Sequence, residues 1–270
     1  MSSFDLTGKT AVVTGGAGIL CSAIARMFAQ NGVRVAILDL AEDRACALAE
    51  ELGDSTKVIG IGTNVLDRGS IEAAAAQIRD TLGSVDILIN GAGGNKFEAT
   101  TSDKLSFFDL SPEAAQWVFN LNFLGTFLPS QVFGRQMVEQ NSGVIINISS
   151  MNAFRPLTRV PAYSAAKAAI SNFTQWLAVH MAQEYSTSIR VNAIAPGFFL
   201  TEQNHYLLVD AQTGELTPRG RQILDHSPLG RFGTPEDLFG AIQWLVSPAA
   251  AFVTGVVVPI DGGFSAFSGV

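Results

Sequence analysis

The chain has 270 residues, of which 47% are hydrophobic and 15% are charged, so it can bury a substantial core and does not belong to the disordered class. Its formal net charge of −7 and pI near 4.9 argue against a nucleic-acid-binding surface. Its two cysteines, Cys21 and Cys46, form neither a disulfide framework nor a metal-ligand spacing, and no signal-like start or membrane-spanning apolar run is present. We therefore expect a cytoplasmic protein without a bound metal or a membrane partner.

Seven short apolar runs alternate with segments of helical pattern along the chain. The runs are residues 10–14, 33–38, 57–61, 85–90, 144–148, 189–194 and 256–260. Apolar strands separated by helices are typical of a parallel sheet that is covered on both faces. The sequence therefore predicts an α/β fold with a Rossmann-type, doubly wound, seven-stranded parallel sheet. Because no Pro-, Gly- or Ser-rich linker interrupts this rhythm, residues 1–270 are expected to form a single domain.

The first strand ends in a glycine-rich run, TGGAGILC at residues 14–21, which leads into the helix predicted at Ile19–Gln30. In dinucleotide-binding proteins, glycines after a strand let the backbone approach a pyrophosphate, which the N-terminus of the next helix attracts. The run does not match the GxGxxG spacing, because Cys21 occupies the place of the third glycine, where packing is its simplest role. Cofactor contacts are expected from Gly15, Gly18, Ile19 and Leu20.

Asp39 ends the second strand and is followed by Leu40. A carboxylate at this place can accept hydrogen bonds from the adenosine ribose hydroxyls, and it would repel a 2′-phosphate. The sequence therefore favours NAD(H) over NADP(H) as the cofactor, although Asp39 could instead cap the following helix. Further cofactor contacts are expected where the third and fourth strands end, from Asn64, Val65, Asn90, Ala92 and Gly93.

Tyr163 and Lys167 lie one helical turn apart in the helix predicted at residues 162–183, so they share one face. One charge at about 4 Å and an effective dielectric constant of about 20 contributes about 4 kcal/mol, enough to lower a tyrosine pKa from about 10 to about 7. We therefore expect Lys167 to lower the pKa of Tyr163, which could then donate and accept a proton. Taken alone, such a pair is more often part of a solvated helix face.

In combination, these motifs resemble those of the short-chain dehydrogenase/reductase family over essentially the whole chain. NGAG at residues 90–93 is similar to the family's NNAG, ISS at 148–150 to its serine motif, and NAIAPG at 192–197 to the segment that holds the nicotinamide amide. The resemblance implies a catalytic tetrad of Asn122, Ser150, Tyr163 and Lys167. It also implies cofactor contacts from Tyr163, Lys167, Pro196, Gly197, Phe199 and Thr201.

The resemblance also implies a role for each member of the tetrad. Tyr163 would exchange the proton with the substrate oxygen, and Ser150 would hold that oxygen in place. Lys167 would lower the tyrosine pKa and bind the nicotinamide ribose. Asn122 would keep a water molecule in a proton path toward Lys167.

Segments near residues 93–101, 150–158 and 197–204 resemble the family branch of the D-mannonate oxidoreductases, or fructuronate reductases. A sugar acid needs several hydrogen-bonding side chains and a cation for its carboxylate. Candidate substrate residues are Asn95, Ser150, Asn152, Arg155, Gln203 and Asn204. For the carboxylate, the alternatives to Arg155 are Arg159, Lys96 and Arg231. Residues 198–232 interrupt the strand–helix rhythm and are expected to form a lid over the substrate, with a surface excursion as the alternative.

Two other functions stay open at this point. One is the reduction of another polyol, ketose or 3-oxoacyl substrate, and the other is a binding protein that senses NAD without turning it over. A sensor would have no use for Ser150, Tyr163 and Lys167 together. Two predicted helices are apolar on more than one side. One carries the aromatic residues Trp117, Phe119, Phe123, Phe127 and Phe133, and the other carries the small residues Ala165, Ala168 and Ala169. Members of the family commonly pair these helices into dimers and tetramers, so the resemblance implies a homotetramer, with core packing as the alternative.

Overall fold

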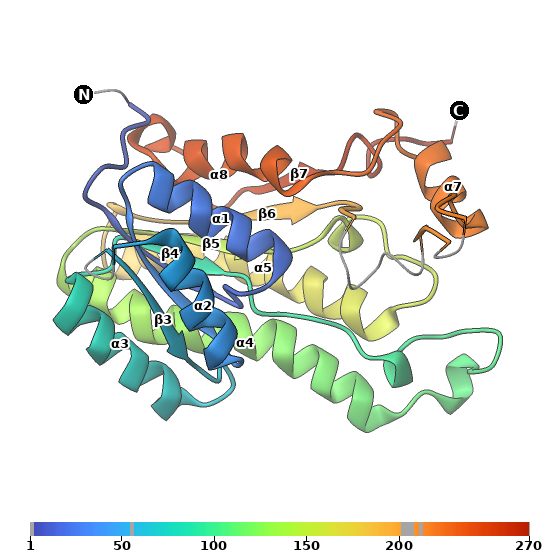
Figure 1. Ribbon diagram of the computed structural model, residues 1–270, viewed down its shortest axis with the longest axis horizontal. Helices are drawn as coiled ribbons and strands as arrows, with labels where there is room; N and C mark the ends of the chain where they lie inside the picture. The colour runs from blue at the N-terminus through green and yellow to red at the C-terminus, as the bar shows by residue number, and fades with distance from the viewer. Residues whose placement is uncertain (1–2, 55–56, 201–207, 211–212, 270) are drawn as a thin grey trace.

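A computed structural model describes residues 3–54, 57–200, 208–210 and 213–269 of the chain (Figure 1). Seven strands form one parallel sheet in the order β3-β2-β1-β4-β5-β6-β7. The strands are β1 (Thr10–Thr14), β2 (Arg34–Asp39), β3 (Val58–Gly62), β4 (Ile87–Asn90), β5 (Gly143–Ile148), β6 (Ile189–Pro196) and β7 (Val257–Ile260). The predicted seven-stranded doubly wound sheet is confirmed, with strand ends displaced by one or two residues.

Helices cover both faces of this sheet (Figure 1). One face carries α1 (Ile19–Gln30), α2 (Glu42–Leu52) and α8 (Phe239–Val246), and the other carries α3 (Arg68–Leu82), α4 (Pro112–Glu139) and α5 (Pro161–Glu184). The remaining described helices are α7 (Pro218–Asp225) and the short 3₁₀ segments η1 (Phe97–Ala99), η2 (Phe107–Asp109), η3 (Met151–Ala153), η4 (Pro235–Leu238) and η5 (Pro248–Ala250).

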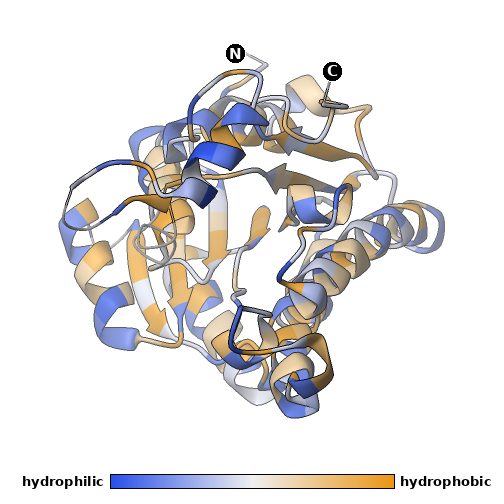
Figure 2. Ribbon diagram, turned by 90° about the vertical axis from the view of Figure 1, so that its right-hand side faces the viewer, coloured by the Kyte–Doolittle hydropathy of each residue, from blue (hydrophilic) through white to orange (hydrophobic). Residues whose placement is uncertain are grey.

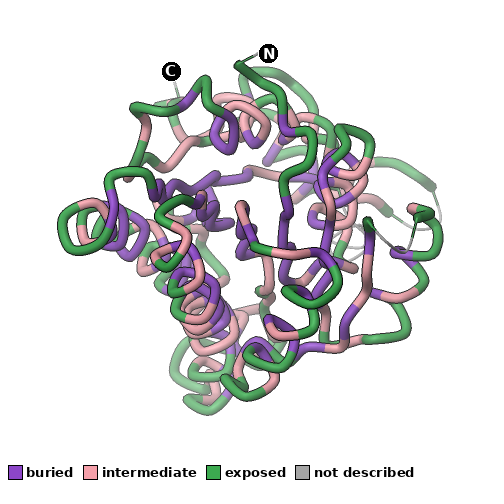
Figure 3. Tube along the Cα trace, turned by 90° about the vertical axis from the view of Figure 1, so that its left-hand side faces the viewer, coloured by how far each residue is buried: buried purple, intermediate pink, exposed green. Residues whose placement is uncertain are grey.

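The two hydrophobic cores follow from the alternation of side chains along each strand. In β1, Ala11 and Val13 point into the core beneath α1 and α8, whereas Val12 points into the core beneath α3 to α5. Because both faces are buried, the strands are apolar at nearly every position, as Figure 2 shows by hydropathy and Figure 3 by burial. This explains why the strands could be recognised as continuous apolar runs.

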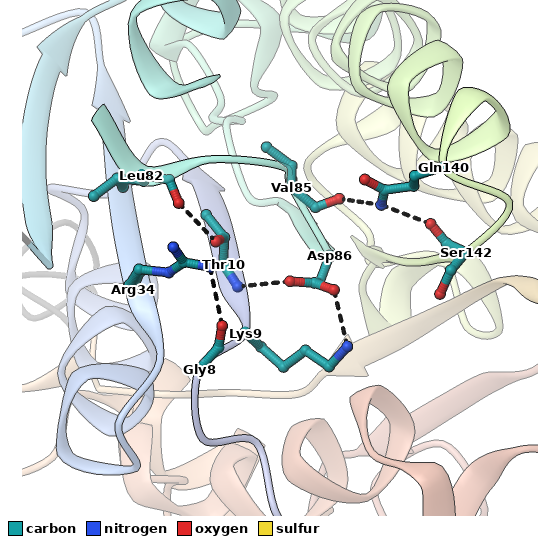
Figure 4. A network of polar contacts seen from close by, with 9 residues as sticks. All are labelled: Gly8, Lys9, Thr10, Arg34, Leu82, Val85, Asp86, Gln140 and Ser142. Carbon is teal, nitrogen blue, oxygen red and sulfur yellow. Dashed lines mark hydrogen bonds and ion pairs between the residues drawn. The ribbon is translucent and has the colours of Figure 1, made fainter. Parts of the chain in front are cut away.

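A network of polar contacts fixes the amino ends of the central strands (Figure 4). The Asp86 carboxylate accepts hydrogen bonds from Lys9 Nζ and from the Thr10 backbone N–H, both at 2.9 Å. Gln140, after α4, donates to the carbonyl oxygens of Val85 and Ser142, each at 2.7 Å. These contacts tie β1, β4 and β5 together at the edge opposite to the glycine-rich turns, so that edge has a structural role.

The described part of the insertion at residues 198–232 contains α7 and lies at the right-hand end of the molecule in Figure 1. Thr217 caps α7 by accepting a hydrogen bond from Gly220 N at 3.0 Å, and Pro218 occupies the first turn, where its missing N–H costs nothing. Among the described residues, no helix has both the length and the apolar character needed to cross a membrane. The same residues contain no group of three or more metal-ligating side chains.

Candidate active site

The glycine-rich turn after β1 lies against the turn after β4, at the point where the chain connections leave the sheet in opposite directions. In doubly wound sheets, ligands bind at this point, outside the carboxyl ends of the strands. Gly15 has a φ of +60°, and a Cβ atom there would lie 2.8 Å from Ala92 Cα, so only glycine allows this close approach. Thr14 Oγ1 joins the two turns by accepting hydrogen bonds from Gly91 N at 3.1 Å and Ala92 N at 3.3 Å.

The N-terminus of α1 opens onto the same turn. Gly18 is the N-cap residue, and no side chain caps the helix, so the N–H groups of the first turn are available to an anion. Beneath them, the Cys21 side chain fills the space that a side chain at Gly91 would need. Burial raises the pKa of the Cys21 thiol to about 12, so the thiol is neutral at physiological pH. The glycine-rich turn and the N-terminus of α1 together fit a pyrophosphate. Cys21 packs beneath them.

Asp39 lies at the end of β2, beside the glycine-rich turn. Its carboxylate accepts hydrogen bonds from Ala17 N and Ala41 N, both at 3.0 Å. Arg44 in α2 donates to the Ala17 carbonyl oxygen at 3.0 Å, so the same peptide segment is held by an acidic and a basic side chain. The sequence analysis missed Arg44, because nothing in the spacing of α2 indicates that it reaches back to the turn after β1.

The two residues expected at the adenine lie in different environments. Asn64 is exposed, and its side-chain oxygen accepts a hydrogen bond from Leu66 N at 3.0 Å, which closes a local turn. Val65 is buried and packs against Gly125 in α4. An adenine contact from either residue stays a prediction.

The four residues of the expected tetrad come from three segments, with Asn122 in α4, Ser150 after β5, and Tyr163 and Lys167 in α5. Ser150 follows β5 and forms a hydrogen bond with the Tyr163 side chain. Lys167 Nζ lies 5.5 Å from the centroid of the Tyr163 ring, one turn further along α5. A Cβ atom added at Gly93 would lie 2.6 Å from Asn122 Oδ1 and 3.4 Å from Lys167 Nζ, so α4 and α5 face each other across this glycine.

The side-chain amide of Asn122 has hydrogen-bond partners for its nitrogen but none among the described residues for its oxygen. Its Nδ2 donates to the carbonyl oxygens of Gly94 and Val118, both at 2.7 Å, and this fixes the orientation of the side chain. Its Oδ1 is buried and has no hydrogen-bond partner among the described residues. A buried amide oxygen without a partner is costly, so it indicates a place for an additional donor on the side of Lys167.

The expected lowering of the Tyr163 pKa by Lys167 is wrong for this structure. Burial raises the pKa of Tyr163, and the hydrogen bond from Ser150 only partly opposes that shift. Burial also lowers the pKa of Lys167, from 10.5 to about 8. Lys167 Nζ donates to the Ile148 carbonyl oxygen at 2.8 Å. Desolvation is the largest effect on both pKa values, so burial disfavours the charged form of each group.

Supporting residues surround the tetrad. Ser149 Oγ donates to the Lys167 carbonyl oxygen at 3.0 Å and lies 2.7 Å from Ser171 Oγ, so Ser149 anchors α5 while Ser150 faces Tyr163. The Asn90 side chain points into the protein and donates to Ser130 Oγ and Asn147 Oδ1, both at 2.9 Å. Asn90 can therefore reach a cofactor only through its backbone. The alternation of side chains after β5 was a signal that Ser149 and Ser150 point in opposite directions.

The expected nicotinamide segment follows β6. Pro196 is buried at the end of that strand, and Gly197 N donates to the Ile260 carbonyl oxygen at 2.9 Å. Phe199 is buried in the core beneath α1 and α8, so its side chain contributes to packing. Thr201, the last residue expected here, lies outside the described residues.

Among the expected substrate residues, Asn95, Asn152 and Arg155 have hydrogen-bond partners within the protein. Asn95 donates to Thr100 Oγ1 at 2.8 Å, and the buried Asn152 donates to Ser164 Oγ at 3.3 Å. Arg155 is exposed, and its Nε donates to the Ser265 carbonyl oxygen at 3.2 Å in the C-terminal segment. Gln203 and Asn204 lie outside the described residues. Sequence spacing alone could not foresee these local partners.

The chain is similar to proteins of known family. The sequence pattern of the short chain dehydrogenases matches residues 9–211. An uncharacterized oxidoreductase UxuB of Bacillus subtilis (strain 168) is 50% identical over 276 residues, covering 98% of each chain. The 2-dehydro-3-deoxy-D-gluconate 5-dehydrogenase of Escherichia coli (strain K12) is 35% identical over 278 residues, covering 98% of this chain and 99% of the other. A Haemophilus influenza protein, crystallised with bound NAD and provisionally described as a D-mannonate oxidoreductase, has a TM-score of 0.92 and 48% identity, and the match covers 98% of each chain.

Proposed function

This chain is an NAD(P)-dependent oxidoreductase of the short-chain dehydrogenase family, and we propose that it transfers hydride between NAD(H) and a sugar acid, D-fructuronate in reduction and D-mannonate in oxidation. The observation that carries the substrate proposal is the 48% identity, over nearly the full length of both chains, to the provisionally described D-mannonate oxidoreductase. The similarity to an enzyme acting on another sugar acid, 2-dehydro-3-deoxy-D-gluconate, supports the same substrate class.

Each step that the protein performs falls to a residue of the tetrad. Bound NADH supplies the hydride for reduction. Ser150 orients the substrate carbonyl oxygen beside the phenol of Tyr163, and Tyr163 donates a proton to that oxygen. Lys167 Nζ lies 5.5 Å from the centroid of the Tyr163 ring, and it would bind the ribose hydroxyls of the nicotinamide. The unpaired Asn122 Oδ1 is placed to bind the water through which the proton is replaced.

We propose NAD(H) as the preferred cofactor because of Asp39. Its carboxylate lies beside the glycine-rich turn, where it can accept hydrogen bonds from two ribose hydroxyls but would repel a 2′-phosphate. The bound NAD in the Haemophilus influenza protein supports this choice. Arg44 donates to the Ala17 carbonyl oxygen and is therefore already engaged at this place.

A substrate and cofactor panel tests both proposals. NADH oxidation should be fastest with D-fructuronate among D-fructuronate, D-tagaturonate, D-fructose and a 3-oxoacyl thioester. It should be at least about tenfold faster with NADH than with NADPH, which corresponds to about 1.4 kcal/mol of discrimination. Activity confined to D-fructose or to the thioester would reject the sugar acid, and equal rates with both cofactors would reject the role of Asp39.

The alternatives from the sequence give different results in the same panel. A reductase of another polyol or ketose would prefer the neutral substrate, and a 3-oxoacyl reductase would prefer the thioester. A protein that only senses NAD would bind NADH and show no turnover with any member. The convergence of Ser150, Tyr163, Lys167 and Asn122 is the feature that a sensor would not need.

We propose a homotetramer in which α4 and α5 pair with the same helices of another copy. Aromatic side chains remain exposed along this face, with Phe119 at 37% and Trp176 at 54%. A hollow of about 460 Å³ lies there, lined by Trp176, Val179 and His180 among others. A two-fold axis would bring identical apolar surfaces together and bury them. Sedimentation at micromolar concentration should give the mass of four chains, and a monomer or a dimer would reject the homotetramer.

A further inference from the structure

We propose that Asn147 and Thr174 are positioning residues, which set the place of Tyr163 relative to Ser150. Asn147 lies in β5, three residues before Ser150, and Thr174 lies in α5, eleven residues after Tyr163. Asn147 Nδ2 donates a hydrogen bond to Thr174 Oγ1 at 2.9 Å. The proposal rests on the roles proposed above for Ser150 and Tyr163, and it does not depend on which substrate is reduced.

The two side chains lie in an apolar part of the core. Asn147 and Thr174 are both 0% exposed. Around them, Ile145 from β5 and Phe173 and Leu177 from α5 belong to the core beneath α3 to α5. Burying an amide and a hydroxyl costs free energy unless each group finds a partner, and apolar side chains would fill the same space without that cost. The directional hydrogen bond adds a fixed alignment of the strand and the helix, which apolar contacts alone do not supply.

Further hydrogen bonds fix the orientation of both groups. Asn147 is the partner of Asn90 in the register of β5 and β4, and its Oδ1 accepts a hydrogen bond from Asn90 Nδ2 at 2.9 Å. Asn90 Nδ2 also donates to Ser130 Oγ in α4 at 2.9 Å. On the other side, Thr174 Oγ1 donates to the Ile170 carbonyl oxygen at 2.8 Å. The Asn147 amide therefore presents its nitrogen to α5, and the Thr174 hydroxyl presents a lone pair in return.

Other hydrogen bonds attach α5 to the end of β5 nearer to the start of the helix. Lys167 Nζ donates to the Ile148 carbonyl oxygen at 2.8 Å. Ser149 Oγ donates to the Lys167 carbonyl oxygen at 3.0 Å and lies 2.7 Å from Ser171 Oγ. Thr174 is seven residues beyond Lys167, which is about 10 Å along a helix. Attachment over two turns resists a tilt of α5 that attachment over one turn would permit.

The alignment of β5 and α5 matters because the two elements carry different parts of the site. Ser150 follows β5, and Tyr163 lies in the first turn of α5. Catalytic groups must be held to within about 0.5 Å of their productive positions, and a displacement of about 1 Å can reduce the rate about 100-fold. Removing the bond between Asn147 and Thr174 leaves the contacts of Lys167 in place. We therefore expect a smaller displacement and a loss of about tenfold in kcat.

The test compares Thr174→Val with Thr174→Ser, and it uses Thr10→Val as a matched control. Valine has nearly the shape of threonine and lacks the hydroxyl group, whereas serine keeps the hydroxyl group and lacks the methyl group. Thr10 is also 0% exposed, and its Oγ1 donates to the Leu82 carbonyl oxygen at 3.3 Å, at the opposite edge of the sheet. Both valine variants thus remove a buried, hydrogen-bonded hydroxyl group, but only Thr174→Val removes it between β5 and α5.

Kinetics are measured with NADH and the panel substrate that the wild type reduces fastest. Thr174→Val should lower kcat about tenfold, while the substrate KM and the Kd of NADH change less than about threefold. Thr174→Ser should keep kcat within about twofold of the wild type, and so should Thr10→Val. A role in stability alone would not give this order, because all three variants are expected to unfold at a lower denaturant concentration. A wild-type kcat in Thr174→Val, or an equal loss in Thr174→Ser or Thr10→Val, would overturn the proposal.

Crystal structures of the variants provide a readout that does not depend on turnover. The distance between the side-chain oxygens of Ser150 and Tyr163 should be longer by about 0.5 Å in Thr174→Val than in the wild type, and unchanged in Thr10→Val. An unchanged distance in Thr174→Val also contradicts the proposal. If the wild type reduces no member of the panel, the proposed function is wrong, and the crystallographic comparison still decides whether Thr174 positions Tyr163.

Discussion

Replacing Tyr163 with phenylalanine is expected to reduce turnover at least about a thousandfold while leaving NADH binding within about threefold of the wild type. The phenol is the group that can pass a proton to the substrate oxygen, and a positioned general acid typically contributes about 10²- to 10⁴-fold to the rate. The substitution removes one hydroxyl group, and with it the hydrogen bond to Ser150, and it leaves the partly buried ring in place. The loss should therefore appear in kcat far more than in NADH affinity.

The measurement is a steady-state assay of NADH oxidation together with a fluorescence titration of NADH. Tyr185→Phe is the matched control, because Tyr185 lies at the end of the same helix, is 56% exposed and undergoes the same loss of a hydroxyl group. This control should retain wild-type activity. Turnover of Tyr163→Phe within tenfold of the wild type would remove Tyr163 from the role of proton donor.

Replacing Lys167 with methionine is expected to abolish turnover and at the same time to stabilise the fold without cofactor by about 2 kcal/mol at pH 7. Burial lowers the pKa of Lys167 from 10.5 to about 8, and at 1.36 kcal/mol per pKa unit the folded chain bears a charging cost of about 3 kcal/mol. Loss of the hydrogen bond to the Ile148 carbonyl oxygen offsets about 1 kcal/mol of the gain. Methionine keeps the length of the side chain, so no large cavity is created.

The effect of Lys167 on the free energy of unfolding should depend on pH. A lysine whose pKa is lower in the folded state than in the unfolded state lowers the free energy of unfolding by its full amount at pH values below the folded-state pKa. This destabilisation decreases as the pH rises and is absent above the unfolded-state pKa. The free energy of unfolding of the wild type should therefore rise, relative to Lys167→Met, between pH 8 and pH 10.5. Denaturant unfolding at several pH values measures this difference, with the exposed Lys104→Met as control. A variant that is clearly less stable than the wild type at pH 7 would contradict the prediction.

These two predictions describe a site in which function is obtained at the expense of stability. Lys167 and Tyr163 are both held in an environment that disfavours their charged forms. The cofactor ribose and the reacting oxygen are the groups that would complete that environment, because they offer hydrogen bonds to the ammonium and the phenol. Ligand binding should therefore increase the free energy of unfolding.

The sequence by itself determined the seven strands, their parallel arrangement and the places where chemistry-bearing residues follow them. These features depend on local patterns, because a strand that is buried on both faces must be apolar throughout and a helix must place residues four apart on one face. Tyr163 and Lys167 could be paired for this reason, whereas Ser150 was selected because its motif resembles that of the family. Gly15 could be selected because a close turn requires a residue without a side chain.

Only the tertiary structure decided which groups are desolvated and which cations are already paired. The pKa of Tyr163 rises where the sequence predicted a fall, because burial desolvates a side chain that packs against Ala99 from η1 and against Ala114 and Val118 from α4. Arg155 donates a hydrogen bond to the Ser265 carbonyl oxygen, although the two residues are 110 positions apart in the sequence. Desolvation and long-range pairing depend on how segments that are distant in the sequence pack together, and no local sequence pattern determines that packing.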